Sequence, residues 1–368
     1  MEGLIASGFE AVAAAFATDP RGGSALTVLR HGEPVVEIHE GWRDAGRTQP
    51  WTADTLVDVY STGKPVIAAA VLRLGIDLDK PMSAYWPSFQ AEVSVRQVLC
   101  HTAGLASFPV PRPVSAWAEW DLLCADLAAA TPAWEPGSVA GEHALTYGHL
   151  LGELVRLVDG RSPARFVREE FGPDLLYDLT PDEQDRCAEL EYSSPSWLAT
   201  TLARSSMLAN PPGAFDVDVV NSPLWRQATI PAVNLHTTAT AVARFYAFSA
   251  ADLPVPQYTG PDRFIGEEVT WGYGVQFEPD GSWGHGGTGG SAGWYDPARG
   301  LAVGYVTRRL GDFAAVDRIE AALGHAETAP GHAETAPGHT ETAPGHTETA
   351  PGHTETALGD AEQARHDL

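Results

Sequence analysis

The amino-acid sequence predicts a mixed α+β fold in which segments from both ends of the chain form a central antiparallel sheet flanked by helices. Two apolar runs with a glycine-containing break, residues 24–32 and 34–42, are typical of an antiparallel hairpin. Helical patterns dominate from about residue 80 to residue 250. Strand-like runs then return at residues 271–279, 290–297 and 301–309. A sheet built from both chain ends, with a largely helical insertion, is the simplest arrangement of these elements.

The remaining elements extend this pattern. The first 20 residues predict an amphipathic helix that ends near Asp19-Pro20. Residues 55–60 predict a strand that runs directly into a helix ending at Gly75, and residues 312–323 predict the last helix. We therefore expect an α/β sheet domain formed by residues 1–79 and 251–323, and a helical domain formed by residues 80–250.

The C-terminal segment has a composition of its own. From Gly324 the chain carries five copies of a seven-residue unit, GHxETAP, in which Leu358 replaces the last proline. The unit has too few apolar residues to bury a core, and its prolines prevent a continuous helix. We expect residues 324–368 to be a disordered acidic tail outside the folded part.

The composition argues against several classes of partner. The chain has 48 acidic and 23 basic residues, a net charge of −25, whereas nucleic acids and anionic membranes require basic patches. No apolar run reaches membrane-spanning length, and the N-terminus lacks the basic segment of a secretory signal. Cys100, Cys124 and Cys187 lack metal-ligand spacing, so we expect reduced, partly buried thiols in a cytoplasmic protein. We expect no metal and no cofactor.

The main chemical signal is a serine followed three residues later by a lysine, Ser61 and Lys64, within the segment DVYSTGKPV. Lys64 is one of only two lysines among the 23 basic residues. A serine needs a base to become a nucleophile, and a buried lysine can lose its proton whereas an arginine stays protonated. The start of the predicted helix also favours an alkoxide or an oxyanion. We predict that Ser61 is a nucleophile and that Lys64 activates it.

Four segments in order carry a family resemblance: DTLVDVYSTGKPVIAAAVLRL, VSVRQVLCHTAGL, IPAVNLHTTATAVARFYA and WGHGGTGGSAGWYDPARGLAVGYV. Together they resemble the serine β-lactamase-like family, which includes class C β-lactamases, D-amino-acid-specific peptidases and transpeptidases, and family VIII carboxylesterases. The resemblance covers nearly all of residues 1–323. It implies an active site between the sheet domain and the helical domain, and an acyl-enzyme on Ser61 formed with the help of Lys64.

The resemblance also gives roles to His285, Gly286 and Gly287, which match the family's Lys/His-Thr/Ser-Gly triplet beside the serine. A lysine there helps to hold the carboxylate of a β-lactam or peptide, whereas esterase-like members commonly carry histidine. His285 therefore disfavours a β-lactamase activity. The two glycines leave room for a substrate along the strand. Carried over from the family, the N–H groups of Thr288 and Ser61 form the oxyanion hole.

The chain departs from the family at its second motif, where a tyrosine usually follows a Pro-Gly pair by five residues. Counting from Gly137 reaches Glu142, and Tyr147 lies about 140° further around a helix. Three accounts remain open: Tyr147 acts after a change of register, Glu142 acts as the base with Lys64, or the change leaves an impaired enzyme that only binds. The register favours Glu142. His143 could also reach the site, although we expect it to face solvent.

The sequence therefore predicts a serine acyl-transfer enzyme, foremost a carboxylesterase acting on small or medium esters. The alternative is a transacylase that passes an acyl group from an ester or thioester donor to an amine or alcohol acceptor, as in secondary metabolism. A non-catalytic binding protein comes third, and a β-lactamase or D-peptidase is less favoured. Small-molecule donors and acceptors are thus the expected partners. Trp117, Trp120 and Trp134 could line an acyl pocket, with core packing as their default role.

Overall fold

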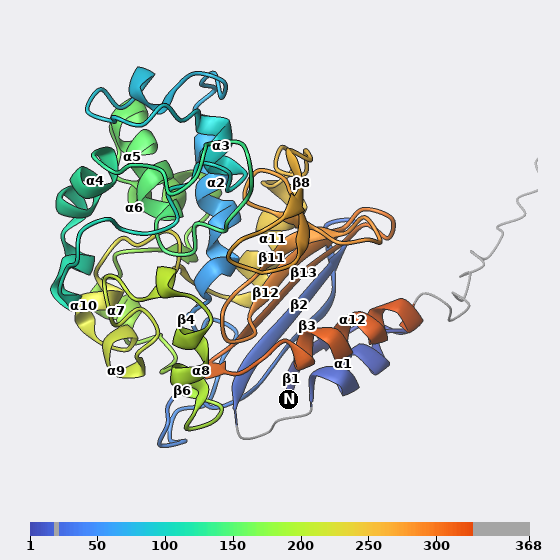
Figure 1. Cartoon of the computed structure of the whole chain (residues 1–368). Helices are drawn as coiled ribbons and strands as arrows, with labels where there is room; N and C mark the ends of the chain where they lie inside the picture. The colour runs from blue at the N-terminus through green and yellow to red at the C-terminus, as the bar shows by residue number, and fades with distance from the viewer. Residues whose placement is uncertain (18–21, 327–368) are drawn as a thin grey trace, which may run out of the picture. The chain divides into compact units, whose positions relative to one another are not determined.

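A nine-stranded antiparallel sheet forms one layer of the molecule (Figure 1). The computed structural model describes residues 1–17 and 22–326. The strand order is β1-β3-β2-β13-β12-β11-β10-β9-β8, so strands from the two ends of the chain lie side by side, as predicted. The strands are β1 Glu2–Ile5, β2 Gly23–Arg30, β3 Glu33–Gly41, β8 Tyr258–Pro261, β9 Glu268–Trp271, β10 Gln276–Phe277, β11 Trp283–Gly286, β12 Ala292–Asp296 and β13 Leu301–Thr307. The predicted hairpin is confirmed as β2 and β3.

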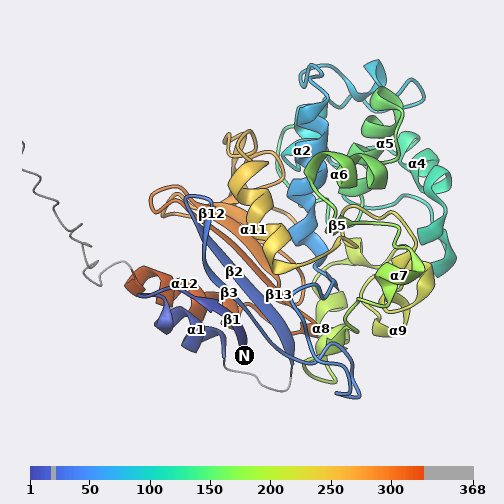
Figure 2. The ribbon, with the colours of Figure 1, turned by 180° about the vertical axis from the view of Figure 1, so that it is seen from behind.

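Helices cover both faces of this sheet. On one face, α1 (Glu10–Phe16) and α12 (Ala314–Ala326) pack against each other over an apolar cluster that contains Val28 and Val303. On the other face, α11 (Ala239–Phe248) packs against β2, β12 and β13 (Figure 2). Successive side chains of a strand point to opposite faces, so each central strand contributes to both apolar clusters.

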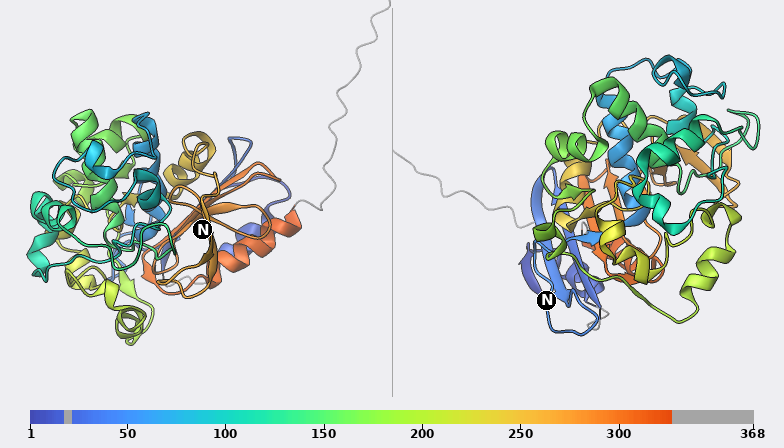
Figure 3. Two further views of the ribbon diagram at one scale, coloured as in Figure 1. Left: turned by 45° about the horizontal axis from the view of Figure 1, so that its top comes forward. Right: turned by 90° about the vertical axis from the view of Figure 1, so that its left-hand side faces the viewer.

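The middle of the chain forms a largely helical layer beside the sheet (Figure 3). Helix α2 (Lys64–Arg73) contacts α5 and α6 as well as β11, and its first eight residues are buried all round. Such burial is typical of a helix enclosed by the rest of the protein. The other helices are α3 Val95–Leu99, α4 Trp120–Ala128, α5 Tyr147–Asp159, α6 Pro163–Phe171, α7 Pro181–Gln184, α8 Trp197–Ala203, α9 Val217–Val220 and α10 Pro223–Arg226. Short 3-10 turns are η1 Tyr60–Gly63, η2 Met82–Ala84, η3 Val114–Ala118 and η4 Ser206–Leu208.

The predicted N-terminal helix is wrong for its first part. Residues 2–5 form strand β1 instead, which pairs with β3 in a register that places Leu4 opposite Glu37. Gly8, with φ of +93°, lies between this strand and α1. The edge of β3 supplies backbone partners that the local sequence pattern does not reveal. The predicted helix end near Asp19-Pro20 lies outside the described residues.

Other boundaries also differ from prediction. The strand predicted at residues 271–279 is divided between the last residue of β9 and the short strand β10. The strand predicted at residues 55–60 is reduced to β4 (Val57–Asp58), which pairs with β7 (His236–Thr237) in a separate small sheet with β5 (Leu175–Leu176). Helix α12 continues to Ala326, three residues beyond the predicted limit. The rest of the predicted tail lies outside the described residues. A further pair of short strands, β6 Glu191–Tyr192 and β14 Arg309–Leu310, is parallel.

The three cysteines are free, and all three are buried rather than partly buried as the sequence predicted. Within residues 1–17 and 22–326, no helix is both long and apolar enough to cross a membrane. The same residues contain no group of three or more metal-ligating side chains arranged to hold a metal ion.

Candidate active site

Ser61 lies on a tight turn between the small sheet and helix α2. Strand β4 ends at Asp58, the turn η1 follows, and α2 begins at Lys64. The turn packs closely against the end of β11, because a Cβ at Gly287 would lie only 2.1 Å from the carbonyl oxygen of Val59. The hydroxyl of Thr62 also donates to the carbonyl of Ser291 at 3.1 Å. These contacts fix the nucleophile turn beside the glycine-rich segment that follows β11.

Lys64 contacts Ser61 directly. Its Nζ atom lies 2.5 Å from Ser61 Oγ, and the lysine side chain is fully buried. Burial disfavours the charged ammonium and lowers the pKa of Lys64, although the neighbouring Glu142 opposes this shift. The arrangement is that of a serine hydroxyl held against an amine that can exchange a proton with it.

Glu142 lies on the other side of the same amine. Its Oε1 atom is 2.9 Å from Lys64 Nζ, and only 9 % of its side chain is exposed. Glu142 precedes α5 in a segment without regular secondary structure, where its backbone N–H donates to Asp262 Oδ1 at 3.2 Å. Burial alone would raise the pKa of Glu142, but the charge of Lys64 holds the pKa below its ordinary value. Ser61, Lys64 and Glu142 therefore form one continuous polar chain.

His285 completes this cluster from strand β11. Its Nε2 atom lies 3.8 Å from Glu142 Oε1 and has no hydrogen-bond partner among the described residues. Its Nδ1 atom lies 2.7 Å from the carbonyl oxygen of Gly286, which can only accept, so Nδ1 carries the hydrogen of the neutral ring. Burial lowers the pKa of His285 to about 4. His285 thus presents an unprotonated Nε2 atom to the site at neutral pH.

The structure places Tyr147 and His143 elsewhere. Tyr147 is the first residue of α5; its hydroxyl donates to the carbonyl of Leu99 at 3.0 Å, and burial raises its pKa well above the usual range. His143 is fully buried rather than solvent-facing, because its Nε2 atom accepts the N–H of Leu105 at 3.2 Å. The structure therefore brings Glu142, and not Tyr147, to Lys64.

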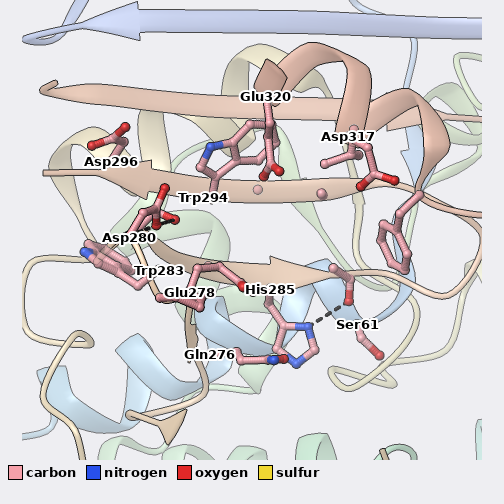
Figure 4. Close-up of a pocket in the computed structure, with 18 of the residues that line it drawn as sticks. Ser61, Gln276, Glu278, Asp280, Trp283, His285, Trp294, Asp296, Asp317 and Glu320 are labelled. Atoms are coloured by element: carbon pink, nitrogen blue, oxygen red, sulfur yellow. Dashed lines mark hydrogen bonds between the residues drawn. The ribbon is translucent and has the colours of Figure 1, made fainter. Parts of the chain in front are cut away.

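A cavity of about 650 Å³ opens above the cluster. Ser61, Glu142, His285, Gly286 and Thr288 line one end of it. From there it extends over β11 and β12 to helix α12, as Figure 4 shows from Ser61 to the acidic residues of that helix. The predicted substrate-contacting residues Gly286 and Thr288 thus lie at the cavity, whereas Gly287 is packed against the nucleophile turn.

Comparison with known proteins places this site in a family. The pattern of the Beta-lactamase family matches residues 9–326. The chain belongs to the beta-lactamase family. It is 32% identical over 340 residues to the esterase/beta-lactamase LipL of Mycobacterium tuberculosis, an alignment that covers 78% of this chain and 77% of LipL.

Solved structures of this beta-lactamase family agree. The crystal structure of a family VIII carboxylesterase superposes with a TM-score of 0.79 at 30% identity, covering 88% of this chain and 99% of that one. A penicillin-binding protein homolog from Caulobacter crescentus superposes with a TM-score of 0.77 at 31% identity, over 88% of this chain and 99% of the homolog. The protein is therefore a beta-lactamase-fold serine hydrolase of esterase-like kind.

The aromatic residues that line the cavity differ from the three tryptophans that the sequence suggested for an acyl pocket. Trp283 on β11 and Trp294 on β12 line it, together with Phe264 and Phe313. The three tryptophans that the sequence suggested do not line the cavity, and each of their indole N–H groups donates to another part of the protein. The position of Trp283 and Trp294 in the sequence could have indicated this, because they flank the glycine-rich triplet of this beta-lactamase-family chain.

Acidic side chains dominate the part of the cavity remote from Ser61. Glu278 and Asp280 follow β10, and Asp317 and Glu320 lie on α12 (Figure 4). Burial, together with repulsion from the nearby carboxylates, raises the pKa of Glu320 to about 7. Two arginines also line the cavity, of which Arg299 lies 3.3 Å from Asp296. A substrate therefore enters a negatively charged environment.

Proposed function

We propose that this protein is a carboxylesterase that forms an acyl-enzyme on Ser61, with Lys64 and Glu142 as its proton-transfer pair. The observation that supports this most strongly is the continuous contact from Ser61 Oγ through Lys64 Nζ to Glu142 Oε1 at the end of an open cavity. By its spacing from Gly137, Glu142 stands where the family that the sequence resembles usually has a tyrosine. The relatives at or above 30% identity include proteins described as esterases, which favours ester substrates.

The pair can move the serine proton without creating net charge. Lys64 Nζ takes the proton of Ser61 as it passes one of its own protons to Glu142 Oε1, and Ser61 Oγ attacks the ester carbonyl. The product of this step is an ammonium beside a neutral carboxyl group and a tetrahedral oxyanion. We assign the N–H groups of Ser61 and Thr288 as donors to that oxyanion.

The second half of the reaction reverses the direction of the proton. The neutral carboxyl group of Glu142 returns its proton through Lys64 to the leaving alkoxide, which departs as an alcohol. A water molecule then loses a proton to the same pair and attacks the acyl-enzyme, and Ser61 regains its hydrogen when the carboxylic acid is released. An amine or an alcohol in place of water would yield the transacylase reaction.

A test of this function can begin before any substrate is identified. A fluorophosphonate probe is expected to add one mass increment to the wild-type protein, at Ser61, and none to Ser61→Ala. Intact-mass measurements with a panel of esters and thioesters should then detect the acyl-enzyme and identify the donor class. Release of an amide when amines are added would identify acyl transfer. A folded wild-type protein that neither labels nor acylates would contradict the proposal and favour a binding protein.

The charge of the cavity predicts a preference among esters. A carboxylate about 8 Å from one of these acidic groups is disfavoured by about 2 kcal/mol at an effective dielectric constant of about 20, and salt reduces this effect. We therefore expect neutral and cationic esters to be preferred over anionic ones. Nitrocefin, which carries a carboxylate, should be hydrolysed slowly, in accord with histidine at position 285.

Three acetate esters of matched shape measure this preference. Their alcohols carry a trimethylammonium, a tert-butyl or a carboxylate group at the same position. The kcat/KM should fall by about tenfold or more from the neutral to the anionic ester, and the ratio should shrink in high salt. The variants Glu278→Gln and Glu320→Gln should also reduce the ratio of kcat/KM between the neutral and the anionic ester. Equal kcat/KM for the neutral and anionic esters would show that the cavity charge does not select substrates.

A further inference from the structure

Asp58 lies three residues before Ser61 and takes no part in the proton transfer described above. Its side chain is almost completely buried, with 3 % of the residue exposed. Its Oδ1 atom accepts the backbone N–H of Tyr60 at 2.9 Å, and its Oδ2 atom accepts the indole N–H of Trp225 at 2.8 Å. Each carboxylate oxygen therefore has a donor of its own, one from the nucleophile turn and one from α10.

The first of these bonds holds an unusual backbone conformation. Tyr60 has φ of +49°, in the left-handed region that residues other than glycine seldom adopt. An aspartate that accepts the N–H two residues further along closes a local turn and makes such a conformation more favourable. Because Tyr60 immediately precedes Ser61, this turn sets the direction in which the serine enters the site.

We propose that the ionised carboxylate of Asp58 is a positioning group that holds Ser61 against Lys64, so that the reactivity of Ser61 requires Asp58 to be ionised. The inference rests on the nucleophilic role proposed for Ser61. A protonated carboxyl group has one oxygen that donates, and that oxygen would face an N–H group. Protonation therefore removes one of the two hydrogen bonds that secure the turn.

Several groups set the proton affinity of Asp58. Burial raises its pKa to about 7, while the hydrogen bonds from Tyr60 and Trp225 and the charge of Arg226 act in the opposite direction. Arg226 lies on α10 next to Trp225, and its guanidinium donates to the carbonyl of Ala188 at 3.3 Å. Arg226 is thus a cation that favours the ionised form of Asp58.

The other titratable neighbours are uncharged at neutral pH. His236 lies directly opposite Asp58 on β7, and burial lowers its pKa to about 3. Burial raises the pKa of the Cys187 thiol to about 11, and it raises the pKa of the Tyr177 and Tyr60 phenols above their ordinary values. A change of activity with pH in this region therefore reports Asp58 rather than these neighbours.

The proposal predicts pH dependences of opposite sign for activity and for stability. The reactivity of Ser61 should rise as pH increases through about 7, because the ionised form of Asp58 is the positioning form. The folded chain, however, binds the Asp58 proton more tightly than the unfolded chain, whose aspartates have a pKa of about 3.9. The contribution of Asp58 to stability therefore declines as pH rises from about 4 to about 7.

The experiment measures how fast a fluorophosphonate labels Ser61 between about pH 5 and about pH 9. The wild-type rate should rise with an apparent pKa of about 7. In Asp58→Asn, one side-chain oxygen remains to accept from the two N–H donors of Tyr60 and Trp225. Ser61 of this variant should therefore be labelled about 10- to 100-fold more slowly at about pH 8, and the rise of the rate with pH should disappear. Its melting temperature at about pH 8 should nevertheless match or exceed that of the wild type, because the buried charge is gone. If Asp58 had a purely structural role, Asp58→Asn would lower both the labelling rate and the melting temperature.

A second variant tests the same idea without altering either hydrogen bond of Asp58. Arg226→Gln removes the cation whose charge favours ionised Asp58, and it should move the rise in labelling to higher pH. The control Arg244→Gln, at an exposed arginine on α11, should leave the rise unchanged. A folded Asp58→Asn that labels at the wild-type rate would overturn the proposal, and so would an unmoved rise in Arg226→Gln. A wild-type protein that does not label at all would instead contradict the nucleophilic role of Ser61.

Discussion

Replacing Lys64 by arginine is expected to lower kcat/KM for ester hydrolysis by about a thousandfold. Lys64 is the buried amine between Ser61 and Glu142, and burial lowers its pKa. An arginine at this position stays protonated and cannot take the serine proton. Its planar group is also too large to occupy the same enclosed space without displacing its neighbours. The rate of Ser61 labelling by a fluorophosphonate should fall in parallel with the esterase activity.

Lys80 provides the matched control for this substitution. It is the only other lysine in the sequence, and its side chain is exposed. Lys80→Arg should change kcat/KM by less than about twofold. A Lys64→Arg protein that is folded and keeps more than about a tenth of the wild-type kcat/KM would contradict the proton-transfer role of Lys64.

The second large effect is expected from Glu142. Glu142→Gln should lower kcat/KM by about a hundredfold or more, because the amide cannot accept the proton that Lys64 passes on. Tyr147→Phe should reduce it by less than about threefold. That variant loses a hydrogen bond to Leu99, which contributes about 1 kcal/mol to stability, but it leaves the polar chain at Ser61 intact. Steady-state kinetics of both variants with the same ester will show which substitution lowers kcat/KM more.

Stability measured against pH gives an independent check on Glu142. Its pKa is held below the ordinary value by Lys64, so the ionised form stabilises the folded state above the unfolded value of about 4.3. This contribution is lost as pH falls through the pKa of the folded state, and Glu142→Gln should remove that part of the acid sensitivity.

A larger activity loss in Tyr147→Phe than in Glu142→Gln, with both proteins folded, would favour Tyr147 as the base.

The sequence is sufficient to predict which reactive side chains lie together when they are close to one another along the chain or at a fixed spacing. Ser61 and Lys64 are separated by one helical turn, so their contact follows from the backbone once the helix is recognised. Counting from Gly137 reaches Glu142, and the structure places the carboxylate of this residue 2.9 Å from Lys64 Nζ. The catalytic roles of these residues stay predictions that the variants above address.

Long-range packing explains what the sequence could not reveal. Strand β1 forms because β3 has a free edge, and no pattern within residues 2–5 reveals that edge. His143 is buried, and it accepts a hydrogen bond from Leu105, which is 38 positions away in the chain. The acidic part of the cavity combines α12 with the segment after β10, and these meet only when the sheet assembles. The position of Asp58 depends in the same way on Trp225, which is 167 positions distant.

The close contact between Gly287 and Val59 limits how this enzyme can acquire new specificities. Any side chain at position 287 would collide with the backbone that carries the nucleophile, so this glycine cannot be exchanged without displacing the nucleophile turn. The segment after β10 and the exposed face of α12 are free of that constraint. Libraries intended to alter substrate range should therefore vary those two segments and keep the glycine fixed, since the reacting groups and the adaptable groups lie on separate parts of the chain.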